Sequence, residues 1–229
     1  MKQIWKQTWR QRLAAALIQL LMVLAMAGVG IRMPVQAAEK NAVTQSGEMK
    51  VHFLDVGQGL SILAQSEGKT MIYDGGDRKT SRFVVSYLKE HGVSKIDYLI
   101  SSHYDADHMT GLIGCLNAFD VKNVISSNYV HTSKLYQSFV KAVKADGLKM
   151  QHPAVGKTYK FGRGSFEILA PKTIEAKGSN NNSVAIKLMN GENSFVFTGD
   201  AEHESEAAMC NSGIDLSCDV LVPGHHGSA

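Results

Sequence analysis

The amino-acid sequence predicts an α/β (α+β) fold in which two mixed sheets pack together and helices flank them. Three patterns lead to this prediction. Residues 49–73 hold short apolar runs joined by turns with no helix between them, which indicates an antiparallel meander. Residues 81–146 alternate between helix-length and strand-length segments, and residues 159–198 form a second run of strands. Two sheets with helices outside them would bury the apolar faces of these segments.

In the first half of the domain, apolar alternation marks the strands and a 3.6-residue period marks the helices. Gly92 and Gly147 stand just past two helices, where a terminal glycine is favoured. His52 falls on the polar phase of the first strand, so we expect an exposed side chain. The predicted elements are strands at residues 49–56, 60–64, 69–73, 96–101 and 122–126, and helices at residues 81–91, 109–119 and 133–146.

The second half of the domain is richer in strands. His131 and His152 lie in polar stretches and are expected at the surface. The predicted elements are strands at residues 159–161, 165–169, 184–189, 193–198 and 219–222, and a helix at residues 202–210.

Residues 1–37 have the pattern of a secretory signal peptide. A basic start is followed by an apolar stretch at residues 13–31 and by the small-residue pattern Val35-Gln36-Ala37, so we expect cleavage after Ala37 or Ala38. The alternative is an uncleaved N-terminal anchor, because residues 13–31 are just long enough to span a bilayer. Either segment predicts a location outside the cytoplasm. Residues 38–48 then form a linker and residues 49–229 the folded domain.

The positive net charge belongs to the leader. The chain has 24 Lys and Arg residues against 21 Asp and Glu, a formal net charge of +3. Five of the basic residues and none of the acidic ones precede residue 38: Lys2, Lys6, Arg10, Arg12 and Arg32. The remaining domain is therefore slightly acidic, and its composition does not indicate a basic nucleic-acid-binding face.

The three cysteines do not form a metal-binding motif. Cys115, Cys210 and Cys218 include no C-x-x-C pair, and an odd number argues against a disulfide framework. Cys115 lies in an apolar helical context and is expected to be buried. Cys210 and Cys218 are compatible with either a disulfide or two free thiols.

A dense group of metal-capable side chains follows the strand predicted at residues 96–101. His103, Asp105, Asp107 and His108 lie within six residues, on a tight loop between that strand and a helix. Two imidazoles and two carboxylates held on such a loop are stabilised when cations lie between them. The alternative is a solvated acidic turn in which Asp105 or Asp107 caps the helix. Histidines at both ends of the stretch favour the metal site.

Further metal-capable residues occur where other predicted strands end. These are Asp74, Asp200 and His225. Functional residues often lie on loops at strand ends, where a rigid scaffold directs them.

These stretches together resemble the metallo-β-lactamase superfamily, with its αββα sandwich. His103-x-Asp105-x-Asp107-His108 is similar to that family's His-x-His-x-Asp-His signature, with Asp105 in place of the second His. This variant resembles the hydrolase domain of the ComEC competence proteins. Further stretches match the same branch: Asp55-Val56-Gly57-Gln58-Gly59, Asp74-Gly75-Gly76, Thr198-Gly199-Asp200 and Gly224-His225-His226-Gly227-Ser228.

The resemblance implies a centre with two divalent ions, Zn²⁺ or Mn²⁺, that share a bridging hydroxide. His103 and Asp105 would hold one ion, and Asp107 and His108 the other. Asp200 would bridge the ions and His225 would complete the second site. Asp74 would accept a hydrogen bond that fixes an imidazole tautomer. Asp107 and His226 are the expected catalytic residues, with His226 orienting substrate or leaving group.

Two departures from the family pattern have consequences. Residues 179–183, Ser-Asn-Asn-Asn-Ser, stand where most members have another His. Asn182 and Ser183 are therefore candidates for contacts with substrate oxygens, and the alternative is a plain polar turn. The chain also stops directly after the last His motif, although the family is expected to continue. The resemblance thus implies a domain that is incomplete at its C-terminus.

The resulting functional hypothesis is a secreted, dinuclear-metal hydrolase that cleaves phosphodiesters, with DNA as the expected partner. An acid-rich metal site suits oxygen-rich substrates and Mn²⁺ as well as Zn²⁺. The alternatives are a hydrolase of cell-wall or small ester or lactone substrates, and a non-catalytic DNA-uptake module. Membrane contact is expected only through an uncleaved N-terminal segment, and no protein partner is inferred.

Overall fold

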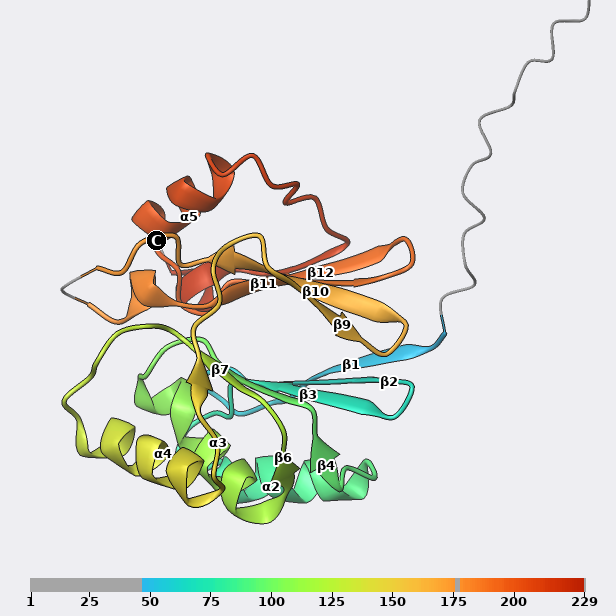
Figure 1. Ribbon diagram of the computed structural model, residues 1–229, viewed down its shortest axis with the longest axis vertical. Helices are drawn as coiled ribbons and strands as arrows, with labels where there is room; N and C mark the ends of the chain where they lie inside the picture. Colours follow the sequence, from blue (N-terminus) through green and yellow to red (C-terminus); the bar gives the residue numbers. More distant parts are fainter. Residues whose placement is uncertain (1–46, 176–177, 229) are drawn as a thin grey trace, which may run out of the picture. The chain divides into compact units, whose positions relative to one another are not determined.

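The computed structural model describes residues 47–175 and 178–228 (Figure 1). All of the described residues belong to one compact unit, Val43–Ala229. The predicted signal peptide or anchor lies outside the described residues, as does most of the predicted linker. Within the described part of the chain, no helix is both long and apolar enough to cross a membrane. The domain boundaries and the incomplete C-terminus remain predictions.

The first sheet is six-stranded and mixed, with the order β1-β2-β3-β5-β7-β8. Strands β1 to β3 form the predicted antiparallel meander, and β3, β5, β7 and β8 run parallel to one another. The parallel pair β4 and β6 forms a separate small sheet. The strand bounds are β1 Met49–Phe53, β2 Ile62–Ser66, β3 Lys69–Tyr73, β4 Lys95–Ile96, β5 Tyr98–Ser101, β6 Asp120–Val121, β7 Val124–Ser126 and β8 Met150–Gln151.

The second sheet is five-stranded, with the order β13-β12-β11-β10-β9. Its strands are antiparallel except for the pair β12 and β13. The bounds are β9 Thr158–Phe161, β10 Gly164–Ala170, β11 Ala185–Asn190, β12 Asn193–Phe197 and β13 Val220–Val222. The 3₁₀ turn η1, Asn180–Asn182, lies between β10 and β11, and a second 3₁₀ turn, η2 Gly224–Gly227, follows β13.

The two sheets face each other between two layers of helices, as Figure 1 shows. Helices α2, α3 and α4 cover the outer side of the first sheet, and α5 covers the outer side of the second. The helix bounds are α2 Ser81–Glu90, α3 Ala106–Ala118, α4 Lys134–Ala145 and α5 His203–Cys210. The predicted α/β sandwich of two mixed sheets flanked by helices is therefore confirmed.

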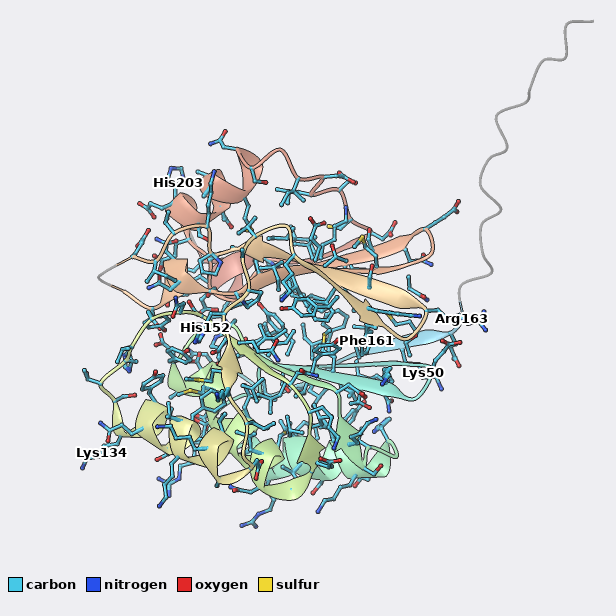
Figure 2. All side chains as sticks on the ribbon, viewed as in Figure 1. Lys50, Lys134, His152, Phe161, Arg163 and His203 are labelled. Carbon is cyan, nitrogen blue, oxygen red and sulfur yellow. The ribbon has the colours of Figure 1, made fainter. Side chains whose placement is uncertain are left out.

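Alternation along the strands produces three apolar layers. Leu63, Ile72 and Leu99 face the helices α2 to α4, whereas their chain neighbours Met71 and Ile100 face the second sheet. Phe161 lies in this inter-sheet layer, while the labelled Lys134 and His203 lie on the outside (Figure 2). Each fully buried side chain of this size contributes about 1.5–3 kcal/mol of transfer free energy. The sandwich thereby holds the loops at the ends of its strands in fixed positions.

The strand predicted at residues 96–101 is divided at Asp97. The Asp97 carboxylate accepts hydrogen bonds from the Thr70 amide at 3.1 Å and the Lys69 ammonium at 2.9 Å. Helix α3 begins at Ala106, three residues before its predicted start. The first turn of α3 therefore contains Asp107 and His108.

His52 is not an exposed strand residue, so that expectation was wrong. Its Nδ1 lies 3.0 Å from the Tyr87 hydroxyl, and its ring packs 4.8 Å from the His91 ring. The face of β1 that carries His52 is covered by α2, whereas Phe53 on the opposite face is 51% exposed. Met49 and Val51 do pack against the inter-sheet layer, so polarity identified the apolar face of β1 but did not reveal that the His52 face is covered as well.

The cysteines are all free in the structure. Cys115 is buried in α3 as expected, and burial raises the pKa of its thiol to about 12. Cys210 is exposed and Cys218 is half-buried, and no disulfide joins them.

Candidate metal centre

The candidate site lies where strands of both sheets end. Asp74 follows β3, His103 follows β5, and Asp200 follows β12. Because β3 and β5 are parallel, their carboxyl ends meet at one edge of the first sheet. His108 lies in the first turn of α3, and His226 lies in the turn η2 that follows β13.

A close backbone approach brings Asp74 against helix α3. The Gly75 amide donates to the His108 carbonyl at 2.7 Å, and the Gly111 amide donates to the Gly76 carbonyl at 3.2 Å. A Cβ atom on Gly111 would lie 1.8 Å from the Gly75 oxygen, so only glycine fits there. Asp74 itself has a φ of 56°, a left-handed conformation that Asp tolerates better than most residues.

Two groups of potential ligand atoms meet at this point. One consists of His103, His108 and Asp200, and the other of Asp107, His108 and His226. In the first group His103 Nε2 lies 3.7 Å from Asp200 Oδ2, and Asp105 Oδ2 lies 3.6 Å from the same nitrogen.

The second group surrounds Asp107. Its Oδ2 lies 3.3 Å from His226 Nε2 and 3.8 Å from His108 Nε2. These separations between ligand atoms are suited to cations placed between them.

Asp200 belongs to the first group and also approaches the second. Its Oδ1 lies 3.1 Å from His108 Nε2, and its Oδ2 lies 3.4 Å from His226 Nε2. The family resemblance implies that this carboxylate bridges two ions, which stays a prediction.

The burial of unpartnered polar atoms shows that the site fits metal ions. His103 Nε2 and Asp200 Oδ1 are buried and form no hydrogen bond, although Asp200 Oδ1 lies near His108 Nε2. Leaving buried polar atoms unpaired is costly, and a cation would satisfy both. His103 and His108 are fully buried, whereas the Asp105 and His226 side chains are 43% and 30% exposed. The cluster therefore has a buried floor and an open rim.

Asp74 fixes the buried side of the cluster. Its Oδ2 lies 2.9 Å from His108 Nδ1 and accepts from the Ser102 hydroxyl at 2.6 Å. Its Oδ1 accepts from the Ser102 amide at 2.8 Å. A hydrogen bond at Nδ1 leaves Nε2 of His108 directed to the other side of the ring, toward Asp107 and Asp200.

The charges of the cluster shift the pKa values of its histidine and aspartate side chains. Burial alone would lower the pKa of His108, but the carboxylates of Asp200 and Asp74 outweigh it and raise the pKa to about 10. Burial alone would raise the pKa of Asp200, but His108 lowers it overall. The His103 ring lowers the pKa of Asp105. Without a metal, His108 thus holds a proton at the position where an ion would bind.

The structure exchanges the positions expected for the two neighbouring histidines. His226 lies in the cluster, where the sequence predicted His225. His225 Nδ1 instead lies 3.1 Å from Glu202 Oε1, outside both groups of ligand atoms. Both residues have positive φ values, 45° for His225 and 57° for His226. The left-handed turn therefore decides which of the two adjacent side chains enters the cluster.

Asn182 and Ser183 do not face an open substrate site, contrary to the prediction. Asn182 is fully buried and bonds to the backbone of Glu175 and Gly178. Ser183 is also fully buried, and its hydroxyl accepts from the Asp200 amide at 3.1 Å. These residues hold the surrounding loops, which agrees with the alternative of a structural polar turn.

Helix capping does not account for the acidic residues of the first motif. Asp105 occupies the N-cap position of α3, but its side chain forms no capping hydrogen bond. The Asp107 carboxylate is directed to His226 and His108. Gly59 allows the loop at residues 55–59 to approach the first turn of α3, because a Cβ on residue 59 would lie 2.2 Å from the backbone carbonyl oxygen of Asp107.

Sequence reasoning missed several residues that support the centre. Ser102 links Asp74 to His103, with its hydroxyl 2.9 Å from His103 Nδ1. Glu202 contacts His225 and accepts from Asn180 Nδ2 at 2.8 Å. The Tyr129 hydroxyl contacts Ser179 beside Asp105. Ser102 and Glu202 stand within two residues of His103 and Asp200 in the sequence, which is a usable signal, whereas Tyr129 comes from a distant loop.

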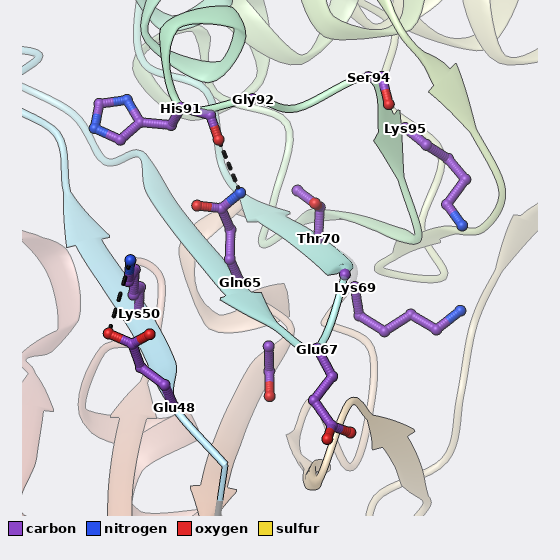
Figure 3. Close-up of a pocket in the computed structure, with 12 residues that line it drawn as sticks. Glu48, Lys50, Gln65, Glu67, Lys69, Thr70, His91, Gly92, Ser94 and Lys95 are labelled. Carbon is purple, nitrogen blue, oxygen red and sulfur yellow. Dashed lines mark hydrogen bonds and ion pairs between the residues drawn. The ribbon is translucent and has the colours of Figure 1, made fainter.

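A separate groove of about 560 Å³ lies near the start of β3, away from Asp74 at its end (Figure 3). Its lining includes Lys50, Lys69 and Lys95. Lys69 and Lys95 lie 2.9 and 3.3 Å from Asp97, and Lys50 lies 3.7 Å from Glu48. Because these cations are already paired, we assign function to the cluster and not to the groove.

Comparison with known proteins identifies relatives of this domain. A family model for the metallo-beta-lactamase superfamily matches residues 54–229. Recombination protein 2 of Haemophilus influenzae is 30% identical over 184 residues, which cover 78% of this chain and 21% of that protein. ComE operon protein 3 of Bacillus subtilis is 27% identical over 202 residues, covering 80% of this chain and 26% of that protein. The chain thus spans only about a fifth to a quarter of their length.

Solved structures share the fold. MEM-A1, a subclass B3 metallo-beta-lactamase isolated from a soil metagenome library, has a TM-score of 0.52 and 15% identity, covering 79% of this chain and 77% of that one. The resemblance predicted from the motifs is confirmed by the family model and by the competence-protein relatives. The chain belongs to the metallo-beta-lactamase superfamily, as a domain related to part of the competence proteins.

Proposed function

We propose that this chain is a hydrolase that uses two divalent ions to cleave phosphodiester bonds in DNA, outside the cytoplasm. The position of Asp200 carries the proposal. Its carboxylate lies 3.7 Å from His103, 3.1 Å from His108 and 3.4 Å from His226, so it approaches ligand atoms of both groups. One carboxylate shared in this way supports a pair of ions.

The donor set favours ions that accept oxygen ligands. The residues that would hold the ions are His103, His108, His226, Asp105, Asp107 and Asp200. Imidazole nitrogens suit Zn²⁺, and the three carboxylates make Mn²⁺ equally suitable. Divalent ions bound there supply Lewis acidity toward a phosphoryl oxygen and make water a stronger nucleophile near neutral pH.

Asp107 and His225 have positions suited to proton handling. The Asp107 carboxylate is 26% exposed at the rim, where it can accept a hydrogen bond from an attacking water. His225 is 38% exposed, and its Nδ1 faces Glu202 at 3.1 Å. A carboxylate only accepts, so this contact places a hydrogen on Nδ1 and leaves Nε2 of the neutral ring as an acceptor. We therefore transfer the predicted role of orienting substrate or leaving group from His226 to His225.

The names of two relatives favour DNA as the substrate in this proposal. Two of them are named for recombination and competence, Recombination protein 2 and Competence protein ComA of Neisseria gonorrhoeae. The domain after residue 37 is slightly acidic, so we expect weak, salt-sensitive DNA binding. The apolar leader at residues 13–31 supports export, with or without cleavage after Ala37 or Ala38.

The test is a cleavage assay with purified, full-length chain on single- and double-stranded DNA. We expect cutting with Mn²⁺ or Zn²⁺, none with chelator, and loss of at least about 100-fold in Asp107→Ala. Asp120→Ala is the matched control, because Asp120 is exposed and pairs only with Lys122 among the described residues. If the folded, metal-loaded protein cuts neither DNA but hydrolyses a small ester or lactone, the DNA proposal is wrong. If it loads metal and hydrolyses nothing, the hydrolase proposal fails as well.

A further inference from the structure

We infer that the buried carboxylate of Asp74 fixes the ring tautomers of two histidines, His108 by direct contact and His103 through Ser102, which is therefore a positioning residue. The inference rests on the proposed metal centre and deepens it, because it assigns the support of the two ions to one buried group. It does not depend on DNA being the substrate.

The linked groups are all buried. Asp74, Ser102, His103 and His108 each have 0% exposure, so water cannot replace the hydrogen bonds between them. The Ser102 hydroxyl lies 2.6 Å from Asp74 Oδ2 and 2.9 Å from His103 Nδ1. On the other side of the carboxylate, the same Oδ2 lies 2.9 Å from His108 Nδ1.

Counting protons fixes the direction of each hydrogen bond. Asp74 receives the Ser102 amide, the Ser102 hydroxyl and His108 Nδ1, so its carboxylate acts only as an acceptor. The one proton of the Ser102 hydroxyl is therefore given to Asp74. The hydroxyl oxygen then has only lone pairs to offer His103, so His103 must carry a hydrogen on Nδ1.

This arrangement leaves Nε2 of His103 without a hydrogen. That atom is buried, has no hydrogen-bond partner and faces Asp200 Oδ2 at 3.7 Å. A second hydroxyl, from Ser183, lies 3.4 Å from His103 Nδ1, beyond the normal range for a strong hydrogen bond. Ser102 is thus the group that directs the free lone pair of His103 toward the ion.

Neighbouring Ser101 provides a matched control. It is also 0% exposed, but its hydroxyl donates to the His103 carbonyl at 2.7 Å and not to the ring. Ser101→Ala therefore removes a buried hydroxyl from the same strand end without changing the ring tautomer. A purely structural role for these serines predicts similar effects of both substitutions.

The first measurement is metal binding by full-length chain, followed by calorimetric titration with Zn²⁺ or Mn²⁺. We expect Ser102→Ala to weaken the ion at His103 by about 10- to 100-fold, and to leave the ion at Asp107 and His226 much less affected. Asp74→Asn should weaken both ions, and Ser101→Ala neither. Equal metal affinities in Ser101→Ala and Ser102→Ala overturn the inference.

The second measurement uses the wild-type protein, so it does not depend on whether a variant folds. Long-range ¹H–¹⁵N spectra of the metal-free chain with labelled histidines should show His103 with its hydrogen on Nδ1. A His103 ring with hydrogen on Nε2 alone overturns the inference. Because this spectrum requires neither bound metal nor cleavage, its result is distinct from failure of the proposed function.

Discussion

Gly75 and Gly111 touch through their backbones, at a separation that leaves no room for a side chain on either residue. A Cβ on Gly111 would lie 1.8 Å from the Gly75 oxygen, and a Cβ on Gly75 would lie 2.5 Å from the Leu112 nitrogen. This contact holds the loop after β3 against α3 and so places Asp74 beside His108. The geometry of the metal centre therefore depends on two glycines that supply no ligand to it.

Gly111→Ala should disrupt the centre. A clash with backbone cannot be relieved by a rotamer change, so we expect a loss of at least about 3 kcal/mol in the free energy of unfolding, together with weaker metal binding. Gly114→Ala is the control on the same helix, because its Cβ would meet the side chains of Ser81 at 2.7 Å and Val85 at 3.3 Å, which can move, and the nearest backbone atom of another element is 3.8 Å away. Denaturant titration of both variants measures the difference. Similar stability in the two variants would show that the Gly75 contact is not tight in solution.

The raised pKa of His108 predicts how the metal-free protein responds to pH. The pKa is about 10 in the folded chain against 6.5 for an ordinary histidine. The contribution to stability is therefore fully present below about pH 6.5 and is lost as the pH rises toward 10, on the order of 4 kcal/mol in all. Unfolding of chelated protein between pH 6 and pH 10, compared with His108→Gln, isolates this contribution.

Metal should reverse that dependence. An ion at His108 Nε2 displaces the proton held there, so metal binding weakens as the pH falls. We expect the stabilisation by added Zn²⁺ or Mn²⁺ to grow between pH 6 and pH 8. Metal stabilisation that is independent of pH would contradict the placement of His108 among the ligands.

Asn182 should matter for stability and not for substrate binding. Its side chain bonds to the amide and carbonyl of Glu175 and to the Gly178 carbonyl, all in the interior of a loop. Leaving these groups unpaired in Asn182→Ala should cost about 3 kcal/mol. Asn180→Ala, whose side chain bonds among the described residues to Glu202 alone, should cost less than about 1 kcal/mol. The reverse order in thermal unfolding would restore the substrate-contact interpretation.

The sequence predicted the sandwich and the clustering of His103, Asp107 and His108 because both follow from local patterns. Strand alternation, helix periodicity and the spacing of His103, Asp105, Asp107 and His108 are visible within a few residues of each other. The position of Asp200 also followed, because it directly ends a clear strand.

The remaining site could not be predicted because it depends on backbone geometry and distant contacts. His225 and His226 are adjacent and chemically identical, and only the left-handed turn η2 decides which enters the cluster. The burial of Asn182 depends on a loop that folds over it. His52 lies under α2, which no pattern within its own strand reveals.

The number of ions bound by ligand variants tests the central claim most directly. Purified wild type and the variants Asp200→Ala and Asp105→Ala would be loaded with Zn²⁺ or Mn²⁺, freed of excess metal and analysed for metal per chain. Asp200 lies within 3.7 Å of His103, His108 and His226, whereas Asp105 belongs to neither group of ligand atoms and lies 3.6 Å from His103. We predict two ions in wild type, about one in Asp105→Ala, and less in Asp200→Ala than in Asp105→Ala. Loss of both ions in Asp105→Ala with none lost in Asp200→Ala would contradict a centre built on a shared Asp200.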